Sequence, residues 1–401
     1  MRIIHTADWH LGQFFYSKSR AAEHQAFLDW LLAEIRTHAV DVLLIAGDLF
    51  DTGAPPSYAR EMFNRFVVAL QPTGCQLIVL AGNHDSVATL NESRELLACL
   101  NTLVVAAPQD VPDVLPLKNH AGEVAALLCP VPFLRPRDIM RSQAGQSGRD
   151  KLLSLQEAIA NHYQRCYDAA LTLRGDKALP IIATGHLTTV GVSKSDAVRD
   201  IYIGTLDAFP AYAFPPADYI ALGHIHRAQR VADSDHIRYS GSPLPLSFDE
   251  LGRNKSVFLL DFAASGLTQV TTLEIPLFQP MQTLKGSLAQ IETQLSQFAE
   301  HTHELPVWLD IEVTTQEYLS DLQQRIEQLA EGLPVEILLL RRSREQRQRS
   351  LSRMENETLS ELNVEEVFER RLALETELEP EEKAPLRDLF RRTLARIEEQ
   401  P

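Results

Sequence analysis

The sequence lacks several features that mark membrane, secreted and disulfide-rich proteins. No apolar run reaches the ~18 residues of a membrane-spanning helix, and the first residues begin a strand-like run instead of a signal segment. The four cysteines (Cys75, Cys99, Cys129 and Cys166) have no C-x-x-C spacing, which fits reduced, buried thiols better than a disulfide framework or a zinc site. We therefore expect a cytoplasmic protein that does not associate with a membrane.

The sequence also lacks an excess of positive charge. Its 38 Lys and Arg residues are outnumbered by 54 Asp and Glu residues, which gives a net charge of −16. This balance is not expected of a protein that coats nucleic acid by itself, although it does not exclude a local basic groove. A pair of divalent metal ions would also bring about four positive charges to a site. Charge therefore weakens a nucleic-acid function without excluding it.

The apolar pattern predicts three parts in the 401 residues, of which the first is residues 1–275. In this part, strand-like runs such as Val42–Ala46 and Leu77–Leu80 alternate with helical stripes. The alternation is typical of an α/β fold whose sheets are covered by helices. Other segments are expected to be helical, at Val87–Leu100 and Lys151–Leu173, or a surface loop, at Pro130–Gly148.

Two further parts follow, residues 276–340 and residues 341–401. The first combines two helical stripes with the alternating segment Val307–Val313, which predicts a small α+β domain docked on residues 1–275. The last part begins with a basic linker at 341–353 and continues with two amphipathic stripes, which predict a helical hairpin. These helices either fold back on the chain or bind a partner protein, and the linker favours the partner.

Five short motifs end apolar runs of the first part, and together they carry seven potential metal ligands. They are D-W-H-L-G at 8–12, G-D-L-F-D at 47–51, G-N-H-D at 82–85, G-H at 185–186 and G-H-I-H at 223–226. Polar side chains that follow the strands of an open α/β sheet gather at one edge of that sheet. The potential ligands are Asp8, His10, Asp48, Asn83, His186, His224 and His226.

Carboxylate, amide and imidazole groups without a thiolate suit Mn²⁺ or a related divalent ion better than structural zinc. In D-x-H and H-x-H, side chains two residues apart point to the same side of an extended chain, so both can reach one metal cluster. Asp48, at the tip of its run, is the natural candidate for a carboxylate that bridges two ions. Two metals ~3.5–4 Å apart lower the pKa of a shared water and stabilise an in-line displacement at phosphorus.

His84 follows the potential ligand Asn83 directly, so it is expected at the rim of the metal cluster. There its imidazole would stabilise the charge of the phosphoryl group or protonate the leaving oxygen. Asp51 and Asp85 are close in sequence and are expected to orient a histidine. A single motif of this kind is more often a turn or a capped loop residue, but five motifs after five strand-like runs favour a metal site.

In their order, the motifs resemble those of the calcineurin-like metallophosphoesterase superfamily. The resemblance implies a two-sheet sandwich flanked by helices, and it implies that His84 is the catalytic histidine. It further implies one metal ion bound by Asp8, His10, Asp48 and His226, and a second bound by Asp48, Asn83, His186 and His224.

A closer similarity is to a bacterial nuclease subfamily of this superfamily. It rests on residues 1–12, the 47–51 motif, Tyr239–Pro243, the small α+β domain and the helical tail. It implies a Mn²⁺-dependent DNA nuclease that acts as an exonuclease on duplex ends and as an endonuclease on hairpins. It also implies that the small domain caps the nuclease, and that a homodimer binds a coiled-coil ATPase through residues 341–401.

Three questions stay open at the level of sequence. The metal motifs alone do not choose between a nuclease, a small-molecule or protein phosphoesterase, and a scaffold with a structural metal. Lys18, Arg20 and Arg137 lie in expected loops, with no stronger indication that they contact DNA. The apolar stripes near 56–70 and 87–100 fit a dimer face and burial against the sheet equally well.

Overall fold

The computed structural model describes most of the first 342 residues. The described residues are 1–109, 111, 113–140, 148–193, 198, 208–300, 305–314 and 322–342, with Leu372, Leu386, Leu389 and Phe390. Residues Met1–Glu312 and Ser320–Arg341 form one compact unit. The linker and helical hairpin expected at 341–401 lie almost entirely outside the described residues, as does Leu319 of an expected helical stripe. Among the helices that are described, none is long and apolar enough to span a membrane.

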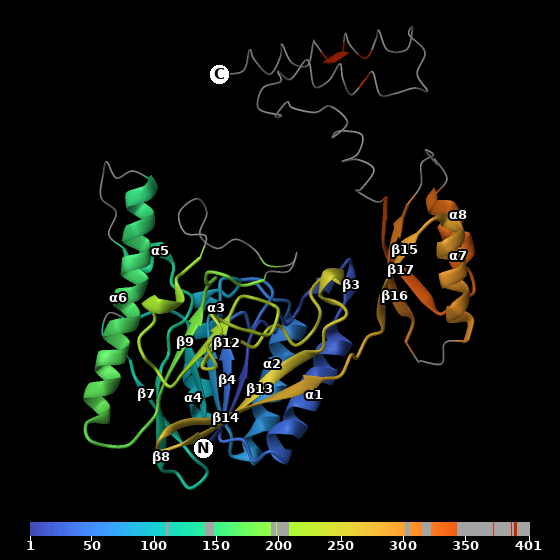
Figure 1. Cartoon of the computed structure of the whole chain (residues 1–401). Helices are drawn as coiled ribbons and strands as arrows, with labels where there is room; N and C mark the ends of the chain where they lie inside the picture. Colours follow the sequence, from blue (N-terminus) through green and yellow to red (C-terminus); the bar gives the residue numbers. More distant parts are fainter. Residues whose placement is uncertain are drawn as a thin grey trace. The chain divides into compact units, whose positions relative to one another are not determined.

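The first sheet has six strands in the order β14-β13-β1-β4-β5-β6 (Figure 1). Four run parallel, namely β1 (Arg2–Thr6), β4 (Val42–Ala46), β5 (Gln76–Leu80) and β6 (Thr102–Val105), whereas β13 (Lys255–Ala263) and β14 (Gly266–Ile275) are antiparallel. Parallel neighbours need crossover connections, which contain α1 (Ala21–Thr37), α2 (Ser57–Leu70), η1 (Gln71–Thr73), α3 (Val87–Asn91) and α4 (Arg94–Cys99). The carboxyl ends of β1, β4 and β5 therefore open at the same edge.

The second sheet also has six strands, in the order β11-β12-β10-β9-β8-β7. Its strands are β7 (Leu115–Lys118), β8 (Val124–Cys129), β9 (Ile181–His186), β10 (Tyr219–Gly223), β11 (Gln229–Arg230) and β12 (Ile237–Tyr239). Strands β8, β9, β10 and β12 are parallel, and β7 and β11 are antiparallel edge strands. The long helix α6 (Gly148–Arg174) connects β8 to β9, and η2 (Ala211–Ala213) precedes β10.

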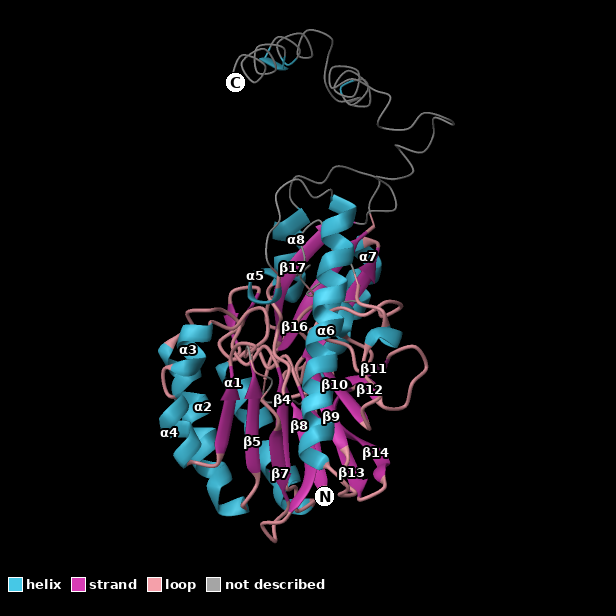
Figure 2. Cartoon of the chain, turned by 90° about the vertical axis from the view of Figure 1, so that its left-hand side faces the viewer, coloured by secondary structure: helices cyan, strands magenta, loops and turns pink. Residues whose placement is uncertain are grey.

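Alternate residues of each central strand pack into different cores. In β4, Val42 and Leu44 pack between the two sheets, whereas Leu43 and Ile45 pack beneath the helices of the first sheet. In β9, Ile182 likewise faces the other sheet while its neighbours face α6. Figure 1 shows α6 on one side of the strands and α1 and α2 on the other, and Figure 2 shows the same layers after a quarter turn. The expected two-sheet sandwich flanked by helices is confirmed.

Two local expectations are wrong. Residues 87–100 form two short helices, α3 and α4, because Ser86 caps the first and the polar residues that follow it favour turns over a continuous helix. The segment 130–148 was expected to be a surface loop, but it contains α5 (Pro136–Ile139) and buries Val131, Phe133 and Leu134 under α6. Its prolines and arginines dominate the composition, whereas the apolar residues between them determine the packing.

The small α+β domain has a three-stranded sheet in the order β15-β16-β17. Its elements are β15 (Met281–Gly286), α7 (Leu288–Ser296), η4 (Gln297–Glu300), β16 (Val307–Val313), α8 (Leu322–Ala330) and β17 (Val335–Arg342). Ser287 begins α7 with a capping box to Gln290. Met281 and Trp308 pack with Phe15, of the hairpin β2 (Phe14–Phe15) and β3 (Lys18–Ser19), and with Phe248 of η3 (Phe248–Glu250). Aromatic burial thus holds this domain against residues 1–275, as expected.

Candidate metal centre

The expected ligands lie where parallel strands of the two sheets end. In the first sheet, Asp8 follows β1, Asp48 follows β4 and Asn83 follows β5. In the second sheet, His186 is the last residue of β9, and the H-x-H pair follows β10. The two groups meet, because the ligand atoms of Asp8, Asp48 and His186 all lie within 4.8 Å of one another. Sequence-distant side chains of both sheets therefore converge on one site.

Several residues of the site have a left-handed backbone conformation, with φ of 56° for Asp8, 46° for His10, 52° for Asp48 and 90° for His224. Such a conformation costs a residue that carries a Cβ on the order of 1–3 kcal/mol. Backbone hydrogen bonds maintain it: the N–H of Asp8 donates to the carbonyl of Gly47 (2.9 Å), and the N–H of His10 donates to the carbonyl of Asp48 (3.1 Å). The loops after β1 and β4 thus hold each other.

The glycines of the motifs allow the ligands to approach one another closely. A Cβ added at Gly47 would lie 2.1 Å from Nδ1 of His186, and one added at Gly82 would lie 2.1 Å from Oδ1 of Asp48. Both distances are far below van der Waals contact, so a side chain at either position would displace a ligand. Glycine is required here for space, and at Gly47 also for its φ of 96°.

The first group of ligand atoms belongs to Asp8, His10 and His226, whose atoms lie within 4.8 Å of one another. All three side chains are buried. Nδ1 of His10 lies 3.2 Å from Oδ1 of Asp51, so Asp51 contacts a histidine of the site. Burial by itself would lower the pKa of His10, but Asp51 and the negative charge of Asp48 raise it above its usual value.

The second group joins Asp48, Asn83, His186 and His224. Nε2 of His186 lies 2.9 Å from Oδ1 of Asn83 and 3.2 Å from Oδ2 of Asp48, and Nδ1 of His224 lies 3.1 Å from the same Asn83 oxygen. Nδ1 of His186 donates to the carbonyl of Ala46 (3.0 Å), which leaves Nε2 facing the other ligands. Burial lowers the pKa of His186, but Asp48 outweighs burial and raises it to about 9.

Asp48 belongs to both sides of the site. Its Oδ1 accepts a hydrogen bond from the backbone N–H of His84 (2.8 Å), and its Oδ2 lies 3.2 Å from His186 and 3.7 Å from Nε2 of His10. Burial would raise the pKa of Asp48, but the surrounding histidines, His186 first, hold it well below the usual range. An ionised carboxylate between two sets of nitrogen and oxygen donors has the position that a bridging ligand needs.

The donor set fits two divalent cations. It consists of imidazole, carboxylate and amide groups, with no thiolate among the described residues that form it. In the structure, the buried carboxylates are balanced by imidazoles whose pKa values are raised, as for His10 and His186. Divalent ions bind the neutral imidazole and the ionised carboxylate, so they would supply this positive charge instead.

His84 lies at the rim of the site and is half-buried. Its Nδ1 lies 2.7 Å from the carbonyl oxygen of Asp51, so an Nδ1–H donates there and Nε2 faces away from that contact. Its ring is perpendicular to that of His10, with the centroids 4.7 Å apart. A ligand atom of His84 also lies within 4.8 Å of those of His10 and Asp48. The imidazole can thus reach a phosphate held by the ligands of the first group.

Comparison with known proteins identifies the family. Residues 1–228 match the model of the calcineurin-like phosphoesterases, and residues 277–376 match SbcD_C, the type 5 capsule protein repressor C-terminal domain. The SbcD subunit of the nuclease SbcCD of Escherichia coli K12 is 64% identical over 394 residues, which are 98% of each chain. The chain belongs to the SbcD family of nuclease subunits.

More distant members of the SbcD family also match. The SbcD subunit of the Rhodobacter capsulatus nuclease is 36% identical over 300 residues, 71% of each chain. Its counterpart in Bacillus subtilis is 30% identical over 326 residues, 80% of this chain and 81% of the relative. The expected resemblance to the superfamily and to its bacterial nuclease subfamily is confirmed, and membership implies that the chain binds divalent metal ions.

Asp85 makes contacts that differ from those expected. Its two carboxylate oxygens accept hydrogen bonds from the backbone N–H groups of Leu49 (3.1 Å), Phe50 (3.0 Å) and Gly82 (2.8 Å). The buried carboxylate therefore connects the loops after β4 and β5, which carry Asp48 and the pair 83–84 in this SbcD-family chain. These contacts do not favour the prediction that Asp85 orients a histidine, because its partners are backbone groups.

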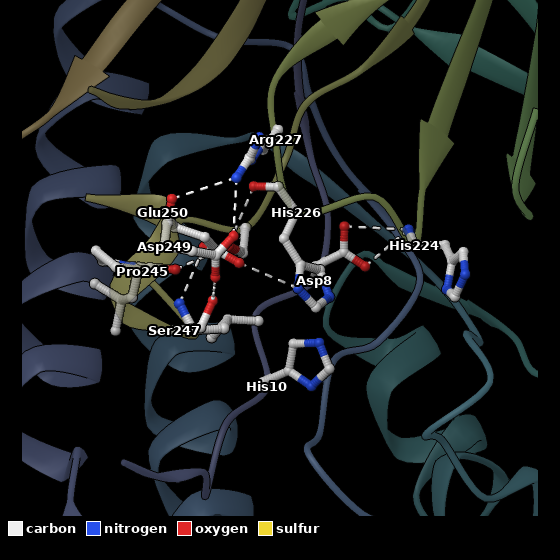
Figure 3. Close-up of polar contacts among 12 residues, drawn as sticks. Asp8, His10, His224, His226, Arg227, Pro245, Ser247, Asp249 and Glu250 are labelled. Carbon is white, nitrogen blue, oxygen red and sulfur yellow. Dashed lines mark hydrogen bonds and ion pairs between the residues drawn. The ribbon is translucent and has the colours of Figure 1, made fainter. Parts of the chain in front are cut away.

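Three residues that support the site had no role assigned from the sequence. Glu250 and Lys255 are buried behind His226, where Oε1 of Glu250 lies 3.5 Å from the histidine Nδ1 (Figure 3). The hydroxyl of Tyr239 donates to the carbonyl of Leu187 (2.6 Å), next to His186. Tyr239 belongs to a motif that had indicated only the subfamily. The other two residues lie 24 and 29 positions after His226, without any local pattern that could have indicated them.

The basic residues considered for DNA contacts differ in their surroundings. Arg20 is completely buried, where it pairs with Glu23 (2.6 Å) and donates to the carbonyl of Pro245 (2.5 Å). It is therefore structural and cannot contact DNA. Lys18 pairs with Glu336 of the small domain at 2.8 Å, whereas the side chain of Arg137 is 78% exposed.

Proposed function

We propose that the chain is a Mn²⁺-dependent DNA nuclease that holds two metal ions at the strand-end site. Asp8, His10, Asp48 and His226 would bind one ion, and Asp48, Asn83, His186 and His224 would bind the other. The observation that carries this proposal is the convergence of the two ligand groups on Asp48. Oxygen and imidazole donors without thiolate are consistent with Mn²⁺.

When bound, the two ions would lower the pKa of a water and stabilise the oxygens of the phosphate during an in-line displacement. The residues of the chain have separate tasks in this reaction. Asp48 keeps the two ligand groups together, and Asp51 orients the ring of His10. His84, fixed through its Nδ1 by the carbonyl of Asp51, would place Nε2 where it stabilises the phosphate charge or protonates the leaving oxygen.

The proposed substrates are duplex DNA ends, cut as an exonuclease, and DNA hairpins, cut as an endonuclease. The relatives named as nucleases cover almost the entire chain, including the small α+β domain. This domain packs through Met281 and Trp308 on Phe15, which belongs to the hairpin that follows the D-x-H motif. A small-molecule phosphatase has no evident use for such a domain beside its metal site, so the arrangement favours a polymeric substrate.

The proposed partner is an SbcC-type coiled-coil ATPase, bound through residues 341–401. The printed name of the relatives describes one subunit of SbcCD, and the apolar stripes of the tail need a surface on which to be buried. A partner that carries much of the DNA-binding surface would also account for the net charge of −16. We further propose a homodimer through the α2 and α4 surface, where Val68 and Leu96 are exposed.

A direct test compares two substrates on the Mn²⁺-loaded protein, a DNA hairpin and a phosphomonoester such as p-nitrophenyl phosphate. We expect cleavage of the hairpin and little turnover of the monoester. Turnover of the monoester without any cleavage of DNA would instead support the second candidate, a small-molecule or protein phosphoesterase. Binding of metal with no turnover of either substrate, alone or with the ATPase, would indicate a scaffold with a structural metal.

Truncation after Arg342 is expected to abolish association with the ATPase while fold and metal binding are retained. The cut leaves β17 complete and keeps the pair of Arg341 and Asp310 (3.1 Å), because these stabilise the small domain. Co-purification and thermal melting measure the two effects. Within the full chain, Leu389→Asp changes the apolar stripe, and Arg391→Asp places the same side chain outside it. Retained association after the truncation would contradict the docking proposal.

A further inference from the structure

We propose that Glu250, fixed by Lys255, is a positioning residue that selects the metal-binding form of His226. The inference rests on the proposed role of His226 as a ligand. Glu250 ends the short turn η3, 24 residues after His226, and its side chain is buried. Oε1 of Glu250 lies 3.5 Å from Nδ1 of His226, and Figure 3 shows the carboxylate facing this ring, with Asp8 and His10 also beside the ring.

The contacts of Glu250 leave it no freedom to turn away. Its Oε2 accepts hydrogen bonds from the backbone N–H of Leu246 (3.0 Å) and from Nζ of Lys255 (2.5 Å). Both donors engage the same oxygen, so the other oxygen, Oε1, is directed at His226. The carboxylate is thus oriented by two donors on one side and presents an acceptor on the other.

Lys255 connects the same network to the backbone of His226. Its ammonium donates to Oε2 of Glu250, to the carbonyl oxygen of His226 (2.9 Å) and to Oγ of Ser242 (2.8 Å), which uses all three of its N–H groups. The N–H of Ser242 also donates to the His226 carbonyl (3.2 Å). One buried cation therefore fixes both the main chain of the proposed ligand and the carboxylate that faces its ring.

The direction of the contact determines which ring nitrogen can bind a metal. An ionised carboxylate only accepts hydrogen bonds, so the Nδ1 that faces Glu250 must carry the proton. Nε2 then has a free lone pair, and the ligand atoms of Asp8, His10 and His226 come within 4.8 Å of one another. A carboxylate behind a ligating histidine also makes it a stronger donor.

The two proposed metal positions differ in this respect. The histidines of the first, His10 and His226, each have a carboxylate at Nδ1, from Asp51 and Glu250. In the second position, Nδ1 of His186 donates to the backbone carbonyl of Ala46. A change at Glu250 should therefore affect the first position and leave the second unchanged.

Glu250→Gln tests the inference with a side chain of nearly the same shape. Leu246 and Lys255 both donate at the Oε2 position, so the amide oxygen of glutamine takes that place and its NH₂ group faces His226. This group is a donor, so it forces Nδ1 to accept and moves the ring proton to Nε2, which blocks the metal. We expect the affinity for one Mn²⁺ ion to fall about 10- to 100-fold, while the affinity for the other is unchanged.

The measurement uses the full chain, stripped of metal and titrated with Mn²⁺. Calorimetry gives the two dissociation constants, and the exchange-coupled electron paramagnetic resonance signal reports whether both positions are filled together. Asp249→Asn is the matched control, because it makes the same acid-to-amide change one residue away, at a side chain that pairs with Arg227 (2.8 Å). It should bind both ions as the wild type does.

A second variant covers the case in which Glu250→Gln does not fold. Glu250→Leu with Lys255→Met removes both buried charges together, which is less costly than leaving one unpaired. Whichever of the two variants folds, loss of affinity for one ion supports the inference. Wild-type affinity for both ions in that folded variant overturns it.

His226→Ala separates this inference from the proposed function. If His226→Ala loses one Mn²⁺ ion and folded Glu250→Gln loses none, only the positioning role of Glu250 fails. If His226→Ala binds both ions with wild-type affinity, His226 is not a ligand, and the proposed ligand set fails together with the inference.

Discussion

Replacing His84 with glutamine is expected to leave both metal ions bound and to slow DNA cleavage by about 100- to 10,000-fold. The proposed ligand sets do not include His84, and its tie to Asp48 is made by the backbone N–H, which every residue at position 84 retains. The imidazole, in contrast, is fixed by the carbonyl of Asp51 so that Nε2 can act on the phosphate. The variant therefore removes a group needed in the transition state and no ligand.

The test of His84→Gln combines Mn²⁺ titration with single-turnover cleavage of a DNA hairpin. His120→Gln is a suitable control, since His120 contacts Asp41 at 2.6 Å, at the start of β4 and away from the metal ligands. Wild-type cleavage by His84→Gln would exclude a catalytic role. Loss of a metal ion would instead show that His84 is a ligand, as its closeness to His10 and Asp48 also allows.

The choice of ester distinguishes the two possible roles of His84. A general acid matters most when the leaving oxygen is a poor leaving group, as in DNA, and little when it is p-nitrophenolate. If His84 protonates the leaving oxygen, His84→Gln should be far more damaging with DNA than with bis(p-nitrophenyl) phosphate. If His84 stabilises the charge of the phosphate, both substrates should lose rate to a similar extent.

Asp48→Asn is expected to abolish the paired metal site and to lower cleavage about 1000-fold or more, since metal binding contributes several kcal/mol to the transition state. The asparagine lacks the negative charge and has one oxygen in place of two. If that oxygen accepts the N–H of residue 84, the NH₂ group faces His186 and the proposed metals. If the amide turns over, two N–H donors face each other in a buried place, which is unfavourable.

Loss of the exchange-coupled Mn²⁺ signal would be the direct sign that Asp48 bridges two ions. Asp41→Asn is the matched control at the opposite end of β4, where the Asp41 carboxylate accepts from the backbone N–H groups of Arg2 (2.7 Å) and His120 (2.8 Å). This control should lose stability but keep both metals. A coupled signal of full intensity in Asp48→Asn would contradict the bridging role.

Much of the fold was predictable because its strands are buried on both faces. Strands such as β4 and β9 are continuous apolar runs, and each run ends where a polar motif begins. The prediction failed at 130–148, where Val131, Phe133 and Leu134 are buried among prolines and arginines. A composition average cannot show which residues of a segment pack, because that depends on α6, which follows in the sequence and covers them.

The candidate site was predictable to a similar depth. The seven proposed ligands and His84 stand in short motifs, since each strand delivers its side chains within a few residues of its end. Residues that hold these ligands were not predictable. Glu250 and Lys255 reach His226 only through the return of β13 beside β1, and Arg20, expected in a loop, is buried against Pro245.

The sequence by itself determined the chemistry of this protein: which donor atoms are available, in which order, and at the ends of which strands. Local spacing carries this information, because side chains at a strand end are neighbours in the chain. Only the tertiary structure decided how these donors are oriented. The carboxylate behind His226, the carbonyl behind His186 and the contacts of Asp85 come from segments 24 to 140 residues away. No local pattern records such pairs, because the packing of the two sheets brings them together.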